Sequence, residues 1–209
     1  MLNLKEVKKY YEDLGGHGFD HVVRVHRMAM KIAKKEKADL RVVDAASWLH
    51  DIARAQEDLK GRKGLCHASE GAKFAKKILK KLNFPEKKIE NVTHCIAVHR
   101  FSKGLKAETK EAKILQDADR LDALGAICIA RVFMFNGLKK LPLHIPERKP
   151  EKHYHGQETT AINHFYEKIL KIKPETFHTK LAKKIAKKRY DSIKEFLKSF
   201  KDEWEGKDA

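Results

Sequence analysis

Imidazole and carboxylate side chains, which are common ligands of divalent metal ions, recur on apolar stretches of this chain. The candidates are His21, His50, Asp51, Asp117, Asp119 and Asp122. Adjacent residues on a helix diverge by about 100°, so His50 and Asp51 reach one ion only from a groove against other helices. The other ligands of such an ion must come from elsewhere in the chain, and helical spacing alone does not choose among the later carboxylates.

Other polar residues are candidates for substrate contacts, and each also has a structural explanation. His94 and His99 are five residues apart, which is about 140° around a helix, so they cannot both face one point. One of them is a candidate phosphate contact. Arg24 follows His21 by about one helical turn, and an ion pair with a carboxylate is slightly favoured over a phosphate contact.

The later polar residues are similarly open to two interpretations. Arg120 and Asp122 either orient metal ligands or contact water and substrate. His164, with Tyr154 and Asn163, either shapes a substrate pocket or packs the last helices.

Apolar residues recur with a period near 3.6 along nearly the whole chain, and this pattern predicts an all-α fold. Six predicted helices are 2–14, 20–37, 67–82, 110–135, 157–172 and 175–203. A further helix follows 20–37, is capped by Asp39 and carries His50 and Asp51 in its final turns. Another begins at Pro85 and carries His94 and His99. His21 lies in the first turn of the second helix. The irregular segment 137–156 is long for a loop inside a compact domain, and such loops are often functional lids or rims.

A chain of 209 residues fits one large domain. We expect a metal-binding core at about 17–135, with the loop 137–156 and the helices of 157–204 completing that domain. The hydrophobic fraction of 42% allows a core without disulfides or a structural metal. Any bound metal is therefore expected to be functional.

The cysteines and the apolar runs indicate an intracellular location. Cys66, Cys95 and Cys128 are widely spaced and form no CxxC pair, so we expect reduced, structural thiols. The sequence shows no signal-peptide pattern and no apolar run near the roughly 18 residues that a membrane span needs. We expect a cytoplasmic protein without a membrane partner.

The chain is strongly basic, with 46 Lys and Arg against 29 Asp and Glu and a formal net charge of +17. Such a charge attracts phosphate-bearing ligands and binds nucleic acid non-specifically. Many lysines form doublets on predicted helices, however, and solvation of outer helix faces is the favoured explanation. No recognised nucleic-acid-binding module and no basic patch interleaved with aromatics is present, so nucleic acid is a less favoured partner.

The ordered set of polar motifs is more specific than any one of them. His21 in His-Val-Val-Arg-Val, His50-Asp51 in Leu-His-Asp-Ile and Asp119 in Ala-Asp-Arg-Leu-Asp resemble the H...HD...D signature of the HD superfamily of metal-dependent phosphohydrolases. The resemblance implies an HD-domain helical bundle with His21, His50, Asp51 and Asp119 as metal ligands. Asp119 is selected because it occupies the Ala-Asp position of the last motif. In some members of the superfamily, further histidines hold a second metal.

The likeness extends to the His94–His99 segment and to the Thr159–Tyr166 segment, which resemble a subgroup of small HD proteins that includes nucleotide pyrophosphohydrolases. This resemblance implies hydrolysis of nucleoside triphosphates to monophosphate and pyrophosphate. The alternatives are a 5'-nucleotidase or phosphodiesterase of the same superfamily, an HD-type nuclease or nucleic-acid-binding protein, and a helical scaffold without catalysis. The candidate substrate contacts are Arg24, His94, His99, Arg120 and His164, with Asp122 as a further contact to substrate or to the metal ligands.

The chemistry of the implied ligands agrees with this function. Two imidazoles and two carboxylates suit a borderline or hard divalent ion such as Mn, Fe, Co, Ni or Mg. Four protein ligands around a six-coordinate ion leave positions for water and for a phosphate oxygen. The ion would then activate the water, orient it for in-line attack and neutralise charge on the phosphoryl oxygens.

Overall fold

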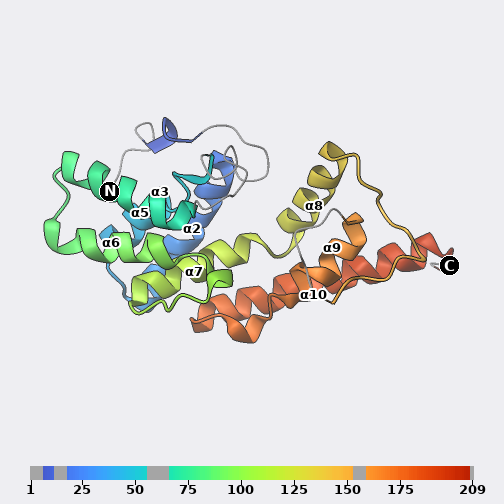
Figure 1. The fold of residues 1–209 in the computed structure, drawn as a ribbon. Helices are drawn as coiled ribbons and strands as arrows, with labels where there is room; N and C mark the ends of the chain where they lie inside the picture. Colours follow the sequence, from blue (N-terminus) through green and yellow to red (C-terminus); the bar gives the residue numbers. More distant parts are fainter. Residues whose placement is uncertain (1–6, 12–17, 56–65, 153–158, 208–209) are drawn as a thin grey trace. The chain divides into compact units, whose positions relative to one another are not determined.

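The computed structural model describes residues 7–11, 18–55, 66–152 and 159–207. Every regular element within these ranges is a helix, which confirms the all-α fold class (Figure 1). The chain divides into two compact units, Met1–Arg120 and Leu121–Ala209. The interpretation as one domain stays a prediction.

In the first half of the chain, the helices follow the sequence pattern closely. Those of the first unit are α2 (Phe19–Glu36), α3 (Leu40–Leu49), α5 (His67–Lys81), α6 (Glu86–Val98), the 3-10 turn η2 (Phe101–Lys103) and α7 (Lys110–Asp122), the last of which ends just past the boundary. Those of the second unit are α8 (Ala126–Leu138), α9 (Ala161–Glu167), the 3-10 turns η3 (Ile169–Lys171) and η4 (Pro174–Thr176), and α10 (Lys180–Trp204). The predicted helices 20–37 and 67–82 match α2 and α5 almost to the residue.

The core of the first unit forms where α2 packs on α3, α3 on α6 and α5 on α6. The apolar stripe predicted on α2 is buried at Val22, Val25, Ala29, Ile32 and Ala33. Asp39 caps α3 as predicted, because its carboxylate accepts hydrogen bonds from the N–H groups of Arg41 (3.0 Å) and Val42 (3.3 Å). These packed helices place the candidate ligands at their ends.

The prediction of one continuous helix over 110–135 is wrong. The structure has two helices, α7 and α8, with a break between Asp122 and Ala126. Gly125 has a φ of 83°, a left-handed value that interrupts a helix and that side-chain-bearing residues disfavour. Helix α8 also continues through Gly137 to Leu138, beyond the predicted end.

The last two predicted helices begin too early. The described part of the predicted helix 157–172 contains α9 and then η3, while the predicted helix 175–203 is preceded by η4 and begins only at Lys180. Threonine side chains set both starts, because Thr160 accepts a hydrogen bond from the N–H of Asn163 (3.0 Å) and Thr179 accepts one from Ala182 (3.2 Å). Hydroxyl caps of this kind fix a helix start more strongly than apolar spacing does.

Several sequence predictions lie outside the described residues. They are most of the predicted helix 2–14, the start of the core at residue 17, and Tyr154. From residue 139 to residue 152 the long segment is irregular, as predicted. It is attached to α9, since the N–H groups of Ala161 and Ile162 donate to the carbonyls of Pro142 and Leu143, each at 3.2 Å.

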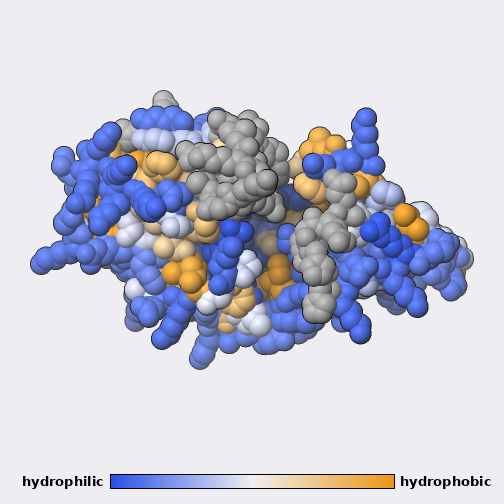
Figure 2. Space-filling model, in the orientation of Figure 1, coloured by the Kyte–Doolittle hydropathy of each residue, from blue (hydrophilic) through white to orange (hydrophobic). Residues whose placement is uncertain are grey.

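Hydrophilic residues cover most of the surface visible in Figure 2. The lysine doublets lie on outer helix faces and are exposed: Lys34-Lys35, Lys76-Lys77, Lys80-Lys81, Lys183-Lys184 and Lys187-Lys188. This placement agrees with solvated faces. Among the described helices, none is by itself long and apolar enough to cross a membrane, and α7 and α8 meet the criteria of length and composition only as a bent pair.

Candidate active site

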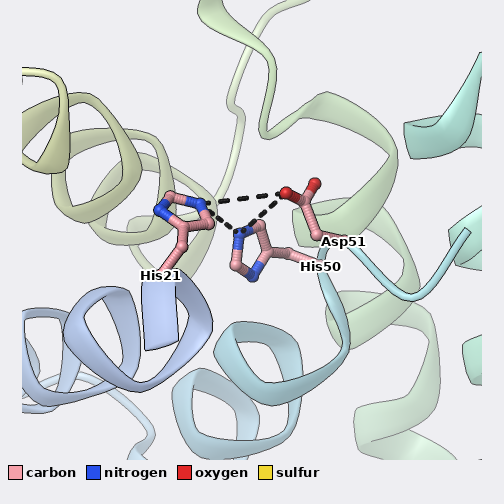
Figure 3. A group of neighbouring side chains, drawn as sticks. All are labelled: His21, His50 and Asp51. Carbon is pink, nitrogen blue, oxygen red and sulfur yellow. Dashed lines mark hydrogen bonds and ion pairs between the residues drawn. The ribbon is translucent and has the colours of Figure 1, made fainter. Parts of the chain in front are cut away.

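Three buried side chains, from the start of α2 and from the turn that ends α3, point toward one another in the first unit (Figure 3). His21 lies in the first turn of α2, His50 is the residue that ends α3, and Asp51 follows in the next turn. The Nε2 atoms of His21 and His50 are 3.4 Å apart, and they lie 3.8 Å and 3.9 Å from Oδ2 of Asp51. Two ligand atoms that are each about 2.1 Å from one ion lie roughly 3.0 to 4.2 Å apart, so these separations suit a shared ion.

Asp119 of α7 joins this group from a third helix. Its Oδ1 lies 3.3 Å from Nε2 of His21. Asp122 is engaged elsewhere, because its Oδ2 accepts a hydrogen bond from Nη1 of Arg131 at 2.9 Å. The structure therefore brings together the four side chains that the sequence motifs selected, and His21, His50 and Asp51 form a group that could hold a metal ion.

A second group forms around the other oxygen of Asp51. Its Oδ1 lies 3.2 Å from Nε2 of His67 and 3.4 Å from Nε2 of His99. These three residues also form a buried group that could hold an ion. Sequence reasoning named His99 but missed His67. The available signal was its position, because His67 begins a helix, as His21 nearly does.

Backbone carbonyls orient two of the imidazoles. Nδ1–H of His50 donates to the carbonyl of Ser47 at 2.9 Å, and Nδ1–H of His99 donates to that of Ile96 at 2.7 Å. A carbonyl only accepts hydrogen bonds, so in the neutral rings the proton is on Nδ1 and the lone pair of Nε2 faces Asp51. This is the arrangement that fixes a histidine as a metal ligand.

The protonation states of the cluster also favour a cation. Burial lowers the pKa of His50 to about 4, although the charge of Asp51 opposes this shift. Burial alone would raise the pKa of Asp119, but the hydrogen bond and charge of His21 hold it at about 2. Burial likewise opposes ionisation of Asp51, yet His50, His67 and His99 keep its pKa well below the usual value. At neutral pH the cluster thus offers two carboxylates and a neutral imidazole at His50.

His99 differs from His50 in its proton affinity. Burial would lower the pKa of His99, but its hydrogen bond to Asp51 and the charge of that carboxylate raise the pKa above the usual value. A protonated His99 donates from Nε2 and cannot act as a metal ligand. In the absence of metal, His99 is therefore better suited to donate its Nε2–H to Asp51 than to bind an ion.

The other predicted contacts in the first unit have local partners. Nη1 of Arg24 pairs with Oδ2 of Asp20 at 2.6 Å, which is the ion pair that the sequence slightly favoured. The Arg120 guanidinium lies 3.6 Å from the centre of the Phe101 ring. His94 is not part of the cluster around Asp51, because its Nε2 accepts the N–H of Glu108 at 3.2 Å. The expectation that His94 and His99 face different points is confirmed.

His164 lies on α9, in the second unit. Burial, assisted by the charge of Lys168, lowers its pKa to about 4. Its side chain is therefore neutral at physiological pH, and its role in substrate binding stays a prediction.

The model of the HD domain matches residues 18–124, which is more than half of the chain. The chain belongs to the HD domain family. The uncharacterized protein YpgQ of Bacillus subtilis (strain 168) is 31% identical over 202 residues, covering 95% of this chain and 89% of YpgQ. The residues 18–124 that match the HD domain contain all of the proposed metal ligands, and members of this family bind divalent metal ions.

Solved structures extend the similarity over nearly the whole chain. An HD-superfamily hydrolase from Bacillus thuringiensis has a TM-score of 0.75 at 34% identity, covering 96% of this chain and 94% of the other. The structure of Bacillus subtilis YpgQ in complex with ADP has a TM-score of 0.74 at 26% identity and covers 99% of this chain and all of the other. This chain is accordingly an HD-superfamily hydrolase.

Proposed function

We propose that this protein hydrolyses nucleoside triphosphates to nucleoside monophosphate and pyrophosphate, with one divalent ion held by His21, His50, Asp51 and Asp119. The observation that carries the proposal is the approach of these four side chains, from α2, from the end of α3 and from α7. The ADP complex of YpgQ supports a nucleotide as the substrate class. Mn, Fe, Co, Ni and Mg all suit this nitrogen and oxygen shell.

The residues of the chain have separate tasks in this proposal. A bound divalent ion supplies an activated water and a positive charge for the phosphoryl oxygens. Asp51 and Asp119 remain ionised, which keeps the ion in place, and the Ser47 carbonyl keeps Nε2 of His50 directed at it. His99, which keeps a proton more readily, donates its Nε2–H to Asp51 or, once substrate is bound, to a phosphate oxygen beside His67.

The remaining predicted contacts are proposals with less support. Arg24 would contact phosphate only by sharing or breaking its ion pair with Asp20. Arg120 would do so only by sharing or breaking its contact with the Phe101 ring. His94 and His164 are proposed to contact other parts of the substrate.

The deciding experiment compares wild type with His50→Ala across a nucleotide panel in Mn, Co, Ni and Mg. We expect the variant to lose bound metal and hydrolysis while circular dichroism shows unchanged helicity, because a ligand is removed from the end of a helix and not from its interior. Metal content is measured by mass spectrometry and the products by chromatography. His178→Ala, which removes an exposed histidine in the second unit, is the matched control. Wild-type activity in His50→Ala would refute the site.

Product analysis separates this reaction from its alternatives. Release of pyrophosphate supports attack at the α-phosphate, whereas orthophosphate from a monophosphate indicates a 5'-nucleotidase, and opening of a cyclic nucleotide indicates a phosphodiesterase. The net charge of +17 favours nucleic acid as a second candidate partner. Tight, length-dependent binding at moderate salt would support that candidate.

A further inference from the structure

The second unit contains a cavity of about 410 Å³ between the segment that follows α8, helix α9 and the end of α10. Its volume lies within the range of about 300 to 1,000 Å³ that is usual for small-molecule sites. Its wall includes His144, Arg148, Lys149, Tyr166, Lys201 and Trp204. None of the residues of the proposed metal site lines it, so it requires a separate explanation.

Aromatic rings form one part of this wall. The ring of His144 stands edge-on to that of Trp204, with centroids 5.1 Å apart, and Trp204 stacks on Phe200 at 5.8 Å. Trp204 is nevertheless 48% exposed. A large aromatic side chain that is held in place and still accessible offers a stacking surface for a planar ligand.

Cationic groups form another part. Arg148, Lys149 and Lys201 line the cavity, and Glu205 is the acidic residue among its lining. The carboxylate of Glu205 accepts a hydrogen bond from Nζ of Lys207 at 2.5 Å, and the charge of this lysine offsets that of the carboxylate. Nζ of Lys201 lies 4.9 Å from the centre of the Tyr166 ring, so positive charge and aromatic surface are adjacent. The lining therefore favours an anion that carries a ring.

Hydrogen bonds shape the cavity in advance. Nδ2 of Asn163 donates to the carbonyl of Arg148 at 2.9 Å, which fixes the irregular segment against α9. Nδ1 of His144 is buried and has no hydrogen-bond partner among the described residues. A buried polar atom without a partner is costly, and a shift of the His144 ring that exposes Nδ1 to a hydrogen-bonding ligand would relieve that cost.

We propose that this cavity is a second binding site for a nucleoside phosphate, independent of the metal. The base stacks on Trp204 beside His144, and the phosphate lies against Arg148 and Lys149. Aromatic residues alone would fit a neutral ring and cations alone a simple phosphate, whereas their combination selects a ligand with both. This site goes beyond the proposed hydrolysis, because it requires no ligand of the metal.

Trp204 itself provides the readout. The chain has two tryptophans, so Trp48→Phe leaves Trp204 as the one fluorescent indole. We expect ADP, added with EDTA present, to change its emission saturably, and adenosine and pyrophosphate to bind more weakly. Arg148→Ala with Lys149→Ala should weaken ADP at least about tenfold. Lys198→Ala, an exposed lysine on the same helix as Trp204 and outside the cavity lining, should leave binding unchanged.

Calorimetry of EDTA-treated protein with native Trp48 makes the test independent of the fluorescence background. The ADP site should persist in His50→Ala and be weakened at least about tenfold in Trp204→Ala. No saturable change of Trp204 emission, or binding that Trp204→Ala leaves intact and His50→Ala removes, would overturn the proposal. Either result leaves the hydrolytic function untouched, because hydrolysis is tested separately by the loss of activity in His50→Ala.

Discussion

Asp51 links two sets of histidines through its two carboxylate oxygens. Oδ2 faces His21 and His50, and Oδ1 faces His67 and His99. A single carboxylate thus sets the position of the metal relative to the imidazoles proposed to meet phosphate. Substitution of Asp51 should therefore disturb both metal binding and phosphate contact. Substitution of a histidine beside only one of its oxygens should disturb one of the two.

His67→Ala distinguishes a phosphate contact from a ligand of a second ion. Because we assign the ion to the opposite oxygen of Asp51, we expect the variant to retain one metal ion per chain. We expect its KM to rise by about tenfold, as for loss of one hydrogen bond to a charged group. Metal analysis and steady-state kinetics make the measurement. A wild type with two ions and a variant with one would contradict the assignment.

At the residue scale, motif order predicted which side chains converge, and the structure brings His21, His50, Asp51 and Asp119 together. His67 was not predicted because its approach to Asp51 depends on how α5 packs, and that packing has no fixed spacing along the chain. Arg24 illustrates the opposite case. Its partner Asp20 lies one turn away on the same helix, so local spacing was sufficient.

At the scale of elements, a break between Asp122 and Ala126 separates the ligand-bearing helix α7 from α8. Gly125 has a positive φ, and a Cβ placed there would lie 3.0 Å from Cγ of Arg189. Both features explain why the helix does not continue. A lone glycine in an apolar helical pattern is usually tolerated, so the pattern predicted one helix, and only the packing of Arg189 shows the break.

Gly125→Ala should destabilise the chain by about 1 to 3 kcal/mol, because alanine disfavours the left-handed backbone and its Cβ would crowd Arg189. The measurement is urea unfolding followed by circular dichroism. Gly137→Ala is the matched control, since Gly137 lies within α8 and a Cβ there would meet nothing within 4 Å. It should stabilise by roughly 0.5 to 1 kcal/mol. Equal effects of the two substitutions would disprove this account of the break.

At the scale of the whole molecule, the buried histidines make stability depend on pH. The pKa of His164 is lowered to about 4 in the folded chain, whereas an unfolded histidine has a pKa near 6.5. Between these values the unfolded chain binds more protons, so the stability that His164 contributes is lost as the pH falls from about 6.5 toward 4.

His164→Gln should flatten this dependence. The melting temperature of wild type should fall more steeply between pH 6.5 and 4.5 than that of the variant, and the difference isolates His164 because the other titrating groups are shared. Differential scanning calorimetry at fixed ionic strength makes the comparison. Parallel pH profiles would contradict the assignment, because they would show that unfolding does not change the protonation of His164 in this window.

The lysine doublets lie on solvated helix faces, as predicted, because amphipathic spacing is a local property of the sequence. For the cavity in the second unit, the sequence indicated only Asn163 as a residue that either shapes a pocket or packs the last helices, and the rest of the lining was not predicted. It depends on contacts between Asn163 and the irregular segment and between His144 and α10, which join residues without a repeating spacing.

The position of His50 and Asp51, at the carboxyl end of α3, has an electrostatic consequence for metal uptake. A chain with a net charge of +17 repels divalent cations at long range. The partial negative charge of the helix end and the carboxylates attract them only nearby. Added salt screens the distant repulsion more than the buried attraction. We therefore expect Mn²⁺ association, followed by stopped flow, to accelerate as ionic strength rises, the reverse of ordinary cation capture by an acidic surface.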